Sequence, residues 1–495
     1  MIESIEASPL YPIANPKSIA LFGASNNVTS MGTSLLDSVL DLGFEGEIYP
    51  IHPKENRVQN LKAYRSVLDL PNAPDLALIV LPTRIVSEAM DACGRKGIRH
   101  AIVISGGFKE VGGDGINLEK ELVAVANKYG MRFLGPNCIG VANPRHKLNT
   151  TFMAFQGAPG FIGMASQSGS FVTQMFSYLS DYALGFSTAF SVGNEANIDI
   201  VDCMEYLGAC PDTRVIALYI EGIRRGRAFV ETARSIVPKK PIVALYVGGS
   251  EAGSRAGLSH TGALAGPDRL YEGIFRQSGI IRARSVMEMF DICWMLGSVP
   301  RTKGRRVVIQ THSGGPGAEA ADACGRAGLE LPSLSPETIK RLSPFIPRTG
   351  SISNPVDFTF GKNLIDYFSE IPKALLDEKN ADILLFYFFM PSRRLERMMK
   401  QVGLPPDQIT EKATKLVDAY SESIMRLFEN HDKPFVGYTF QNLKDPLVRI
   451  LIERGIPIFP GPQRAARAIE AAYRYTRLRD KILAAVSQEA GVGQS

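Results

Sequence analysis

The sequence predicts an α/β protein of three domains, each built around a parallel sheet. Short apolar runs alternate with helical stretches along most of the chain, and this is the rhythm of repeated strand-helix-strand units. The rhythm restarts after Asn143 and again after Val299. A chain of 495 residues is too long for a single hydrophobic core. Its 45% hydrophobic and 21% charged residues are enough to form several folded domains.

The first domain is predicted over residues 1–148 as a doubly wound, Rossmann-like sheet. Continuous apolar runs suit parallel strands that helices cover on both faces. The helices Ile85–Gly97 and Asn117–Gly130 end in glycine, as helix C-termini often do. The expected strands are Ser18–Phe22, Glu47–Ile51, Leu76–Leu81, His100–Ser105 and Arg132–Leu134.

Two further α/β domains are predicted over residues 149–300 and 301–480, followed by a flexible tail, residues 481–495. The helix Ser285–Ser298 is expected to close the second domain, and the helix Gln463–Tyr475 the third. A polar linker, Val299–Gly304, separates them. The expected strands are Ile162–Ala165, Ser187–Val192, Val215–Ile220 and Ile242–Val247, then Arg306–Gln310, Ala381–Phe389, Pro434–Thr439 and Ile456–Phe459.

Composition argues against several classes of protein. The formal net charge of +5 is small and its basic residues are scattered, so we expect no nucleic-acid partner. Six cysteines lie far apart without metal-ligand spacing, which indicates reduced thiols, no metal site and a cytoplasmic location. The acidic N-terminus is no signal peptide, and apolar runs such as Ile383–Met390 are too short to cross a membrane.

The first strand leads into a glycine loop that suits a phosphate-bearing ligand. Gly23 and Ser25 follow the strand, and Met31–Ser34 opens a helix; glycine permits close approach, and the helix start presents free N–H groups. The acidic residue that would hold the ribose of NAD is missing, and the second strand ends in His52-Pro53-Lys54. Lys54 suits the 3′-phosphate of coenzyme A or the 2′-phosphate of NADP, or is an ordinary surface lysine. The other strand ends carry Pro82, Ser105, Asn137 and Cys138, and all should converge on one crevice.

The most unusual segment is Gly248–Gly266, made of small residues with His260 near its middle. Two loops suit a phosphorylated histidine, because each joins a strand to a helix whose N-terminus can stabilise an anion. Glu221 follows a strand and is placed to accept from one imidazole nitrogen, leaving the other as nucleophile. Alternatively, the glycine loops are plain turns and Glu221 is a surface acid. The two loops are Ser166–Ser170 and Ser313–Gly317.

These residues resemble the α-type chain of ADP-forming acetyl-CoA synthetases, relatives of succinyl-CoA synthetase. The resemblance runs in order from about Pro16 to about Tyr475. It is carried by Ile19–Ser25, Gly46–Lys54, Leu134–Cys138, Ser166–Gly169, Ser259–Gly266 and Ser353–Asp357.

The resemblance implies an acid-thiol ligase with a Rossmann-like CoA-binding domain and two flavodoxin-like domains. A carboxylic acid, coenzyme A and ATP would exchange with acyl-CoA, ADP and phosphate through acyl phosphate and a phosphorylated His260, with Glu221 as its orienting partner. The residues implied to cradle the phosphoryl group are Ser166, Ser168, Gly169, Gly314, Gly315 and Gly317. Those implied to line the coenzyme A site are Gly23, Ser25, Lys54, Pro82, Ser105, Asn137 and Cys138.

The resemblance also implies a partner, because such enzymes need an ATP-grasp nucleotide domain and we see none after Tyr475. We therefore expect a separate β subunit in a two-plus-two assembly, holding most of the ATP, ADP and Mg²⁺ site. The sequence departs from the resemblance at His312 and in the basic stretch Met390–Gly403. Two other hypotheses are a non-catalytic CoA-binding regulator of the same fold and an NADP-dependent oxidoreductase.

Overall fold

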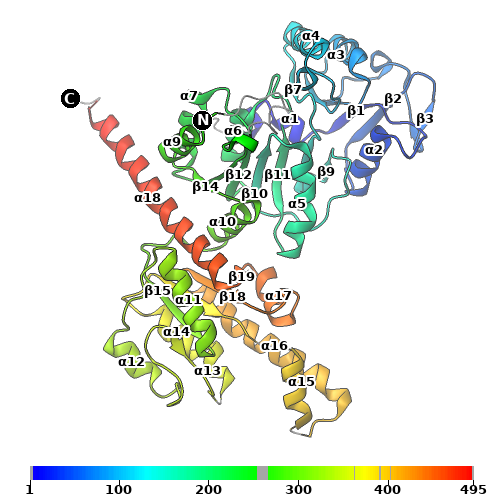
Figure 1. Cartoon of the computed structure of the whole chain (residues 1–495). Helices are drawn as coiled ribbons and strands as arrows, with labels where there is room; N and C mark the ends of the chain where they lie inside the picture. Colours follow the sequence, from blue (N-terminus) through cyan, green and yellow to red (C-terminus); the bar gives the residue numbers. More distant parts are fainter. Residues whose placement is uncertain (1–3, 254–265, 362, 390–391, 402, 493–495) are drawn as a thin grey trace. The chain divides into compact units, whose positions relative to one another are not determined.

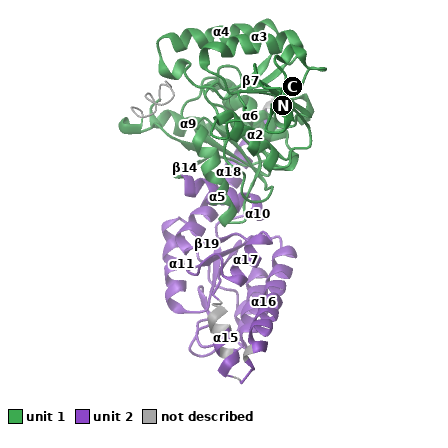
Figure 2. Ribbon diagram, turned by 90° about the vertical axis from the view of Figure 1, so that its right-hand side faces the viewer, with its two compact units in different colours: residues 1–285 green, residues 286–495 purple. Residues whose placement is uncertain are grey.

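The computed structural model describes residues 4–253, 266–361, 363–389, 392–401 and 403–492. The chain forms two compact units, Met1–Ser285 and Val286–Ser495 (Figure 2). The described residues form three large sheets, two in the first unit and one in the second, besides a small β3–β4 hairpin. The predicted α/β class with parallel sheets is confirmed.

The first sheet has the strand order β2-β1-β5-β6-β7, and all its strands are parallel. Helices α3 (Val86–Lys96) and α4 (Asp114–Lys128) lie side by side on it (Figure 1). Phe108, Val103 and Phe133 are fully buried in its core. The strands are β1 Ser18–Phe22, β2 Glu47–Ile51, β5 Leu76–Ile79, β6 His100–Val103 and β7 Arg132–Leu134.

The second sheet has the order β14-β13-β12-β10-β11-β8-β9. The pairings from β14 to β11 are parallel, whereas β8 pairs antiparallel with β11 and with β9. The strands are β8 Val141–Asn143, β9 Leu148–Asn149, β10 Ile162–Ser166, β11 Phe186–Ser191, β12 Val215–Ile220, β13 Ile242–Tyr246 and β14 Ile281–Ala283. Its helices are α5 Gly169–Asp181, α6 Ile200–Ala209, α7 Gly226–Ile236 and α9 Asp268–Ser278.

The sheet of the second unit is parallel throughout, in the order β16-β15-β17-β18-β19. The strands are β15 Val307–Thr311, β16 Val356–Asp357, β17 Ile383–Tyr387, β18 Phe435–Thr439 and β19 Ile458–Pro460. Helix α11 is Gly314–Arg326, and α15 (Ser392–Gln401) packs against the long α16 (Pro406–Glu429).

Helix α10 (Val286–Ser298) belongs to the second compact unit and packs against α18 (Pro462–Val492). The buried Asp291 accepts two hydrogen bonds from Arg464, at 2.7 and 2.6 Å, and the Trp294 ring lies 5.1 Å from Phe459. The division after Ser285 differs from the domain boundaries that the sequence predicts, and those boundaries remain a prediction.

The predicted end of the last helix at Tyr475 is wrong, because α18 continues to Val492. Neither proline nor glycine interrupts the chain between Tyr475 and Gly491, and the stretch contains three alanines, two leucines and two arginines. These residues favour the helix, and the small polar character of the tail does not break it.

Candidate functional site

The first glycine loop is packed against the start of helix α2 (Met31–Asp41). Gly23 has φ +97°, and a Cβ there would lie 2.0 Å from the Val80 carbonyl oxygen. A Cβ on Gly32 would lie 2.3 Å from the Gly23 carbonyl oxygen. The Ser25 N–H donates to Thr33 Oγ1 at 3.1 Å, and the Ser25 carbonyl accepts from that hydroxyl at 2.9 Å. The loop therefore brings bare backbone and a helix N-terminus together, as a phosphate site requires.

The loops after β5, β6 and β7 meet at one edge of the first sheet, as predicted. The Leu81 N–H donates to Ser105 Oγ at 3.0 Å, and the Ser105 hydroxyl donates to the Leu81 carbonyl at 2.6 Å. The Asn137 N–H donates to the Ser105 carbonyl at 2.9 Å. Pro82 begins the short turn after β5. Ser105 thus joins the neighbouring loops, and its hydroxyl is already used by the protein.

Two candidate ligand residues differ in how they are placed. Lys54 is exposed beyond the end of β2, and its N–H donates to His52 Nδ1 at 3.3 Å. Cys138 is buried, with its Sγ 3.4 Å from the Val103 carbonyl oxygen. Burial raises the pKa of the Cys138 thiol to about 12. Lys54 is available to a ligand, whereas Cys138 offers its backbone only.

The two predicted phosphate loops have the same local geometry. The Ser166 hydroxyl, at the end of β10, donates to the Ser168 carbonyl at 2.7 Å, and the helix α5 begins at Gly169. The Thr311 hydroxyl, at the end of β15, donates to the Ser313 carbonyl at 2.8 Å, and α11 begins at Gly314.

Neither helix uses its N-cap side chain. Ser168 and Ser313 are the N-cap residues of α5 and α11, and neither side chain accepts from the first turn. Both helix starts therefore keep N–H groups for an anion. In α11, Gly314 and Gly315 are exposed and Gly317 is buried against Thr311. Because α5 and α11 lie in different units, their predicted cooperation on one anion stays a prediction.

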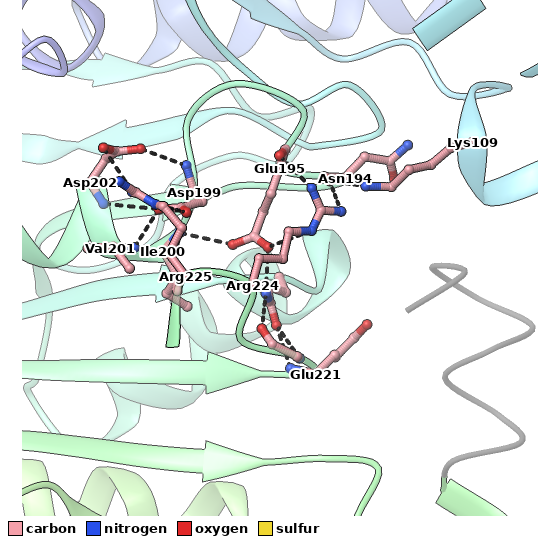
Figure 3. A network of polar contacts seen from close by, with 12 residues as sticks. Lys109, Asn194, Glu195, Asp199, Ile200, Val201, Asp202, Glu221, Arg224 and Arg225 are labelled. Carbon is pink, nitrogen blue, oxygen red and sulfur yellow. Dashed lines mark hydrogen bonds and ion pairs between the residues drawn. The ribbon is translucent and has the colours of Figure 1, made fainter. Parts of the chain in front are cut away.

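Glu221 follows β12 (Figure 3), and its backbone is held by Gln167 of the loop before α5. Gln167 Oε1 accepts from the Glu221 N–H at 2.5 Å and from the Gly222 N–H at 3.0 Å. The Glu221 side chain is 9% exposed, and among the described residues its buried Oε2 has no hydrogen-bond partner. Because buried carboxylate oxygens normally accept a hydrogen bond, we expect a donor for this oxygen.

A loop after β11 lies between Gln167 and the first sheet. Glu195 Oε2 accepts from Gln167 Nε2 at 2.8 Å, and Asn194 Nδ2 donates to Glu119 Oε2 at 2.9 Å. Burial raises the pKa of Glu195 to about 8 and that of Glu119 to about 7. The side chain of Asn137 donates to Asn194 Oδ1 at 3.3 Å. The two predicted sites of the first unit are therefore joined by one polar network, and Figure 3 shows its part around Asn194 and Glu195.

His260 lies outside the described residues, but the residues on either side of its segment are described. The Val247 N–H, just after β13, donates to the Ile220 carbonyl at 2.9 Å. The Tyr246 hydroxyl donates to the Gly266 carbonyl at 2.8 Å. Both flanks of the segment are thus tied to the sheet edge that bears Glu221.

Three family models match consecutive parts of the chain. They are a CoA binding domain at residues 17–144, a succinyl-CoA ligase like flavodoxin domain at residues 159–296 and a ligase-CoA domain at residues 307–403. The α subunit of acetate–CoA ligase [ADP-forming] II from Pyrococcus furiosus is 38% identical over 462 residues, which cover 92% of this chain and 96% of the relative.

The chain belongs to the family of ADP-forming acetate–CoA ligases. The acetate–CoA ligase [ADP-forming] I of Archaeoglobus fulgidus is 36% identical over 94% of this chain and 64% of the relative. The dinucleotide forming acetyl-coenzyme A synthetase 1 of Ca. Korarchaeum cryptofilum, in its apo form, matches with a TM-score of 0.84 and 32% identity, over 96% of this chain and 99% of that one. The same synthetase in complex with phosphate and ADP gives 0.82 and 33%.

Membership of the ligase family confirms the predicted resemblance and the prediction of an ADP-forming ligase with CoA-binding and flavodoxin-like domains. No finding favours the non-catalytic alternative. In the described part of the chain, no helix is long and apolar enough to span a membrane, and no group of three His, Cys, Asp or Glu side chains is placed to hold a metal ion.

Sequence reasoning missed the residues that connect the sites. Gln167 was noticed only as part of a serine loop, and Asn194, Glu195 and Arg224 were not singled out. The available signal was the polar turn Gly193–Glu195 directly after an apolar strand, where parallel-sheet proteins place functional groups.

Proposed function

We propose that this chain is the α-type subunit of an ADP-forming acyl-CoA ligase. The reaction joins a small carboxylic acid to coenzyme A, with ATP converted to ADP and phosphate, through an acyl phosphate and a phosphorylated His260. The observation that carries the proposal is the carboxylate of Glu221. Its Oε2 is buried, has no hydrogen-bond partner among the described residues, and lies at the sheet edge to which the histidine segment is tied.

Glu221 would accept a hydrogen bond from one imidazole nitrogen of His260. This bond fixes the tautomer, so that the other nitrogen keeps its lone pair and attacks the phosphorus of the acyl phosphate or of ATP. The carboxylate leaves as the free acid when the acyl phosphate is the donor, and ADP leaves when ATP is the donor. Glu221 also stabilises the positive charge that develops on the ring during transfer.

The phosphoryl group would be held by the helix starts of α5 and α11. Their first N–H groups and positive dipole ends stabilise an anion without a formal charge. The unused N-cap side chains agree with this assignment, because a capping hydroxyl would take up one of the N–H groups. The residues assigned to this role are Ser166, Ser168, Gly169, Gly314, Gly315 and Gly317.

Coenzyme A would bind at the carboxyl edge of the first sheet. The close approach of Gly23 to the start of α2, where Ser30 caps the Thr33 N–H alone, supports a pyrophosphate position there. The exposed Lys54 suits the 3′-phosphate. The residues assigned to this site are Gly23, Ser25, Lys54, Pro82, Ser105, Asn137 and Cys138, the last through its backbone.

A partner chain would supply the nucleotide site. Two relatives from Pyrococcus furiosus are named as α subunits, and the relative from Archaeoglobus fulgidus is longer, so that the match covers 64% of it. We infer an ATP-grasp β subunit that carries ATP, ADP and Mg²⁺, in an α2β2 assembly located in the cytoplasm.

The test is phosphorylation by labelled ATP and Mg²⁺ in the presence of the co-purified ATP-grasp chain. Acid-labile, alkali-stable label on the parent and none on His260→Asn is the expected result. Equal labelling of both would exclude His260 as the phosphoryl carrier. Absence of label from the parent, together with retained coenzyme A binding, would favour a CoA-binding regulator.

A further inference from the structure

Gln167 makes four hydrogen bonds from a position between two candidate phosphate ligands. Its Oε1 accepts from the N–H groups of Glu221 and Gly222, and its Nε2 donates to the Gly222 carbonyl at 2.7 Å and to Glu195 Oε2 at 2.8 Å. The side chain is 7% exposed. Both donors and both acceptor positions of the amide are therefore committed to the turn that carries Glu221 and to Glu195.

Glu195 is held in place by contacts with residues other than Gln167. Its Oε1 accepts from the Ile200 N–H at 2.9 Å, at the start of α6, and its carbonyl accepts from Arg224 Nη1 at 2.7 Å. Its backbone has φ +54°, a conformation that costs a non-glycine residue free energy and persists only where its surroundings require it. The surroundings here hold the carboxylate against Gln167.

The loop that carries Glu195 is also anchored to the coenzyme A domain. The N–H groups of Asn194 and Ala196 donate to the carbonyls of Pro136 and Gly135, at 2.9 and 3.1 Å. A Cβ on Gly193 would lie 2.3 Å from the Pro136 carbonyl oxygen. The loop therefore has little freedom to move away from Gln167.

Glu221 lacks a comparable hold on its own carboxylate, because its Oε2 has no partner among the described residues. We propose that Gln167 is a positioning residue that sets the direction of the Glu221 carboxylate through the backbone of its turn, and that Glu195 fixes the amide of Gln167. The proposal rests on the proposed function, since it assigns Gln167 a part in orienting His260.

Three charged groups face the Glu195 carboxylate. Arg224 Nε lies 3.9 Å from Oε2, and Asp199 and Arg225 act through their charges. Glu195 remains mostly protonated at pH near 7, because burial raises its pKa to about 8. It can then either accept from Gln167 or donate to a group in its place. A carboxylate in place of the Gln167 amide should therefore make the phosphorylation rate depend on pH.

The experiment compares the single-turnover rate of His260 phosphorylation, by labelled ATP and Mg²⁺ with the ATP-grasp chain, and the Kd of coenzyme A. Gln167→Leu removes all four hydrogen bonds and should lower the rate by about 10- to 100-fold, the usual effect of misplacing a reacting group by about 1 Å. The Kd should change less than about twofold, because Gln167 does not line the coenzyme A crevice.

Two further variants separate positioning from stability. Ser187→Ala removes the buried hydrogen bond between the hydroxyls of Ser187, in β11, and Thr213, which is 2.7 Å long, and should leave the rate unchanged. Gln167→Glu keeps the oxygen that accepts from the Glu221 and Gly222 N–H groups but loses the donor to the Gly222 carbonyl. At about pH 6.5 its second oxygen can accept a hydrogen bond from the protonated Glu195. At about pH 8.5 two carboxylates oppose each other, so the rate should fall at least tenfold relative to the parent over this range.

A labelled parent with Gln167→Leu within twofold of its rate would overturn the inference and leave the proposed function intact. If Ser187→Ala slows phosphorylation as much as Gln167→Leu does, the inference is likewise overturned and the proposed function stays intact. An unlabelled parent would overturn both.

Discussion

The substitution Gly32→Ala tests whether contact between α2 and the first glycine loop builds the coenzyme A site. A Cβ on Gly32 would lie 2.3 Å from the carbonyl oxygen of Gly23, 2.4 Å from its carbon and 2.7 Å from the Ala24 nitrogen. All three are backbone atoms, and ordinary contacts begin at 3.4 Å, so the helix start must move by about 1 Å. Such overpacking costs about 1 to 3 kcal/mol, against a gain of up to about 1 kcal/mol from helix propensity.

We therefore expect Gly32→Ala to destabilise the first unit by about 1 to 2 kcal/mol, which lowers its Tm by roughly 2 to 8 °C. Displacing the helix start from a bound phosphate should weaken coenzyme A binding by about 10- to 100-fold, since a hydrogen bond to a charged group is worth about 1.5 to 3 kcal/mol. Calorimetric titration and thermal unfolding measure the two effects.

The matched control is Gly273→Ala in the middle of α9, where a Cβ meets nothing within 4 Å. It should stabilise the protein by up to about 1 kcal/mol without changing coenzyme A binding. If Gly32→Ala binds coenzyme A with the affinity of the parent and has the same Tm, the reasoning is refuted. It is also refuted if Gly273→Ala loses as much affinity for coenzyme A as Gly32→Ala does.

Three further predictions concern single side chains. Lys54→Met should weaken coenzyme A binding about tenfold and leave the binding of dephospho-coenzyme A unchanged in the same titration; equal losses would contradict a contact with the 3′-phosphate. Burial raises the pKa of Glu195 from its ordinary value of 4.5 to about 8, so the folded state keeps a proton that the unfolded chain releases. The free energy of unfolding should then fall by a few kcal/mol as pH rises from about 4.5 to about 8, and denaturant unfolding of Glu195→Gln should show a flatter profile; a parental slope in this variant would contradict the assignment. Arg464→Ala leaves the buried Asp291 without its two hydrogen bonds and should cost the second unit about 3 kcal/mol in urea unfolding; a loss below about 1 kcal/mol would contradict it.

The sequence predicted the central strands because each is a run of apolar residues long enough to stand out. Ser18–Phe22 and Val215–Ile220 agree at both ends with the structure. The strands β8, β9, β14 and β16, of two or three residues each, were missed. Their existence depends on pairing with distant strands, and no local periodicity reports that.

For the candidate site, the sequence predicted which loops meet but not the contacts between their side chains. Parallel strands bring their carboxyl ends to one edge, which is why Ser105 and Asn137 could be placed together from sequence. The contacts of Gln167 with Glu195 and Glu221 join residues 28 and 54 positions apart. These contacts depend on how the loops after β10, β11 and β12 fold over the edge of the sheet. The local sequence pattern does not indicate that arrangement.

The helix starts of α5 and α11 show how the fold keeps a place for an anion. In each, the last strand residue has a hydroxyl that bonds the carbonyl two residues later, and the N-cap serine leaves its own hydroxyl unused. A serine that caps its helix contributes about 0.5 to 2 kcal/mol, so both domains forgo this stabilisation at the same point. Some other helices are capped, as α2 is by Ser30 and α12 (Pro336–Leu342) by Ser335, whereas Ser369 and Asp445 leave α14 (Glu370–Leu376) and α17 (Pro446–Glu453) uncapped. At α5 and α11 the uncapped start coincides with a loop that the proposed mechanism needs open, and a phosphoryl group would supply the acceptor that the serines withhold.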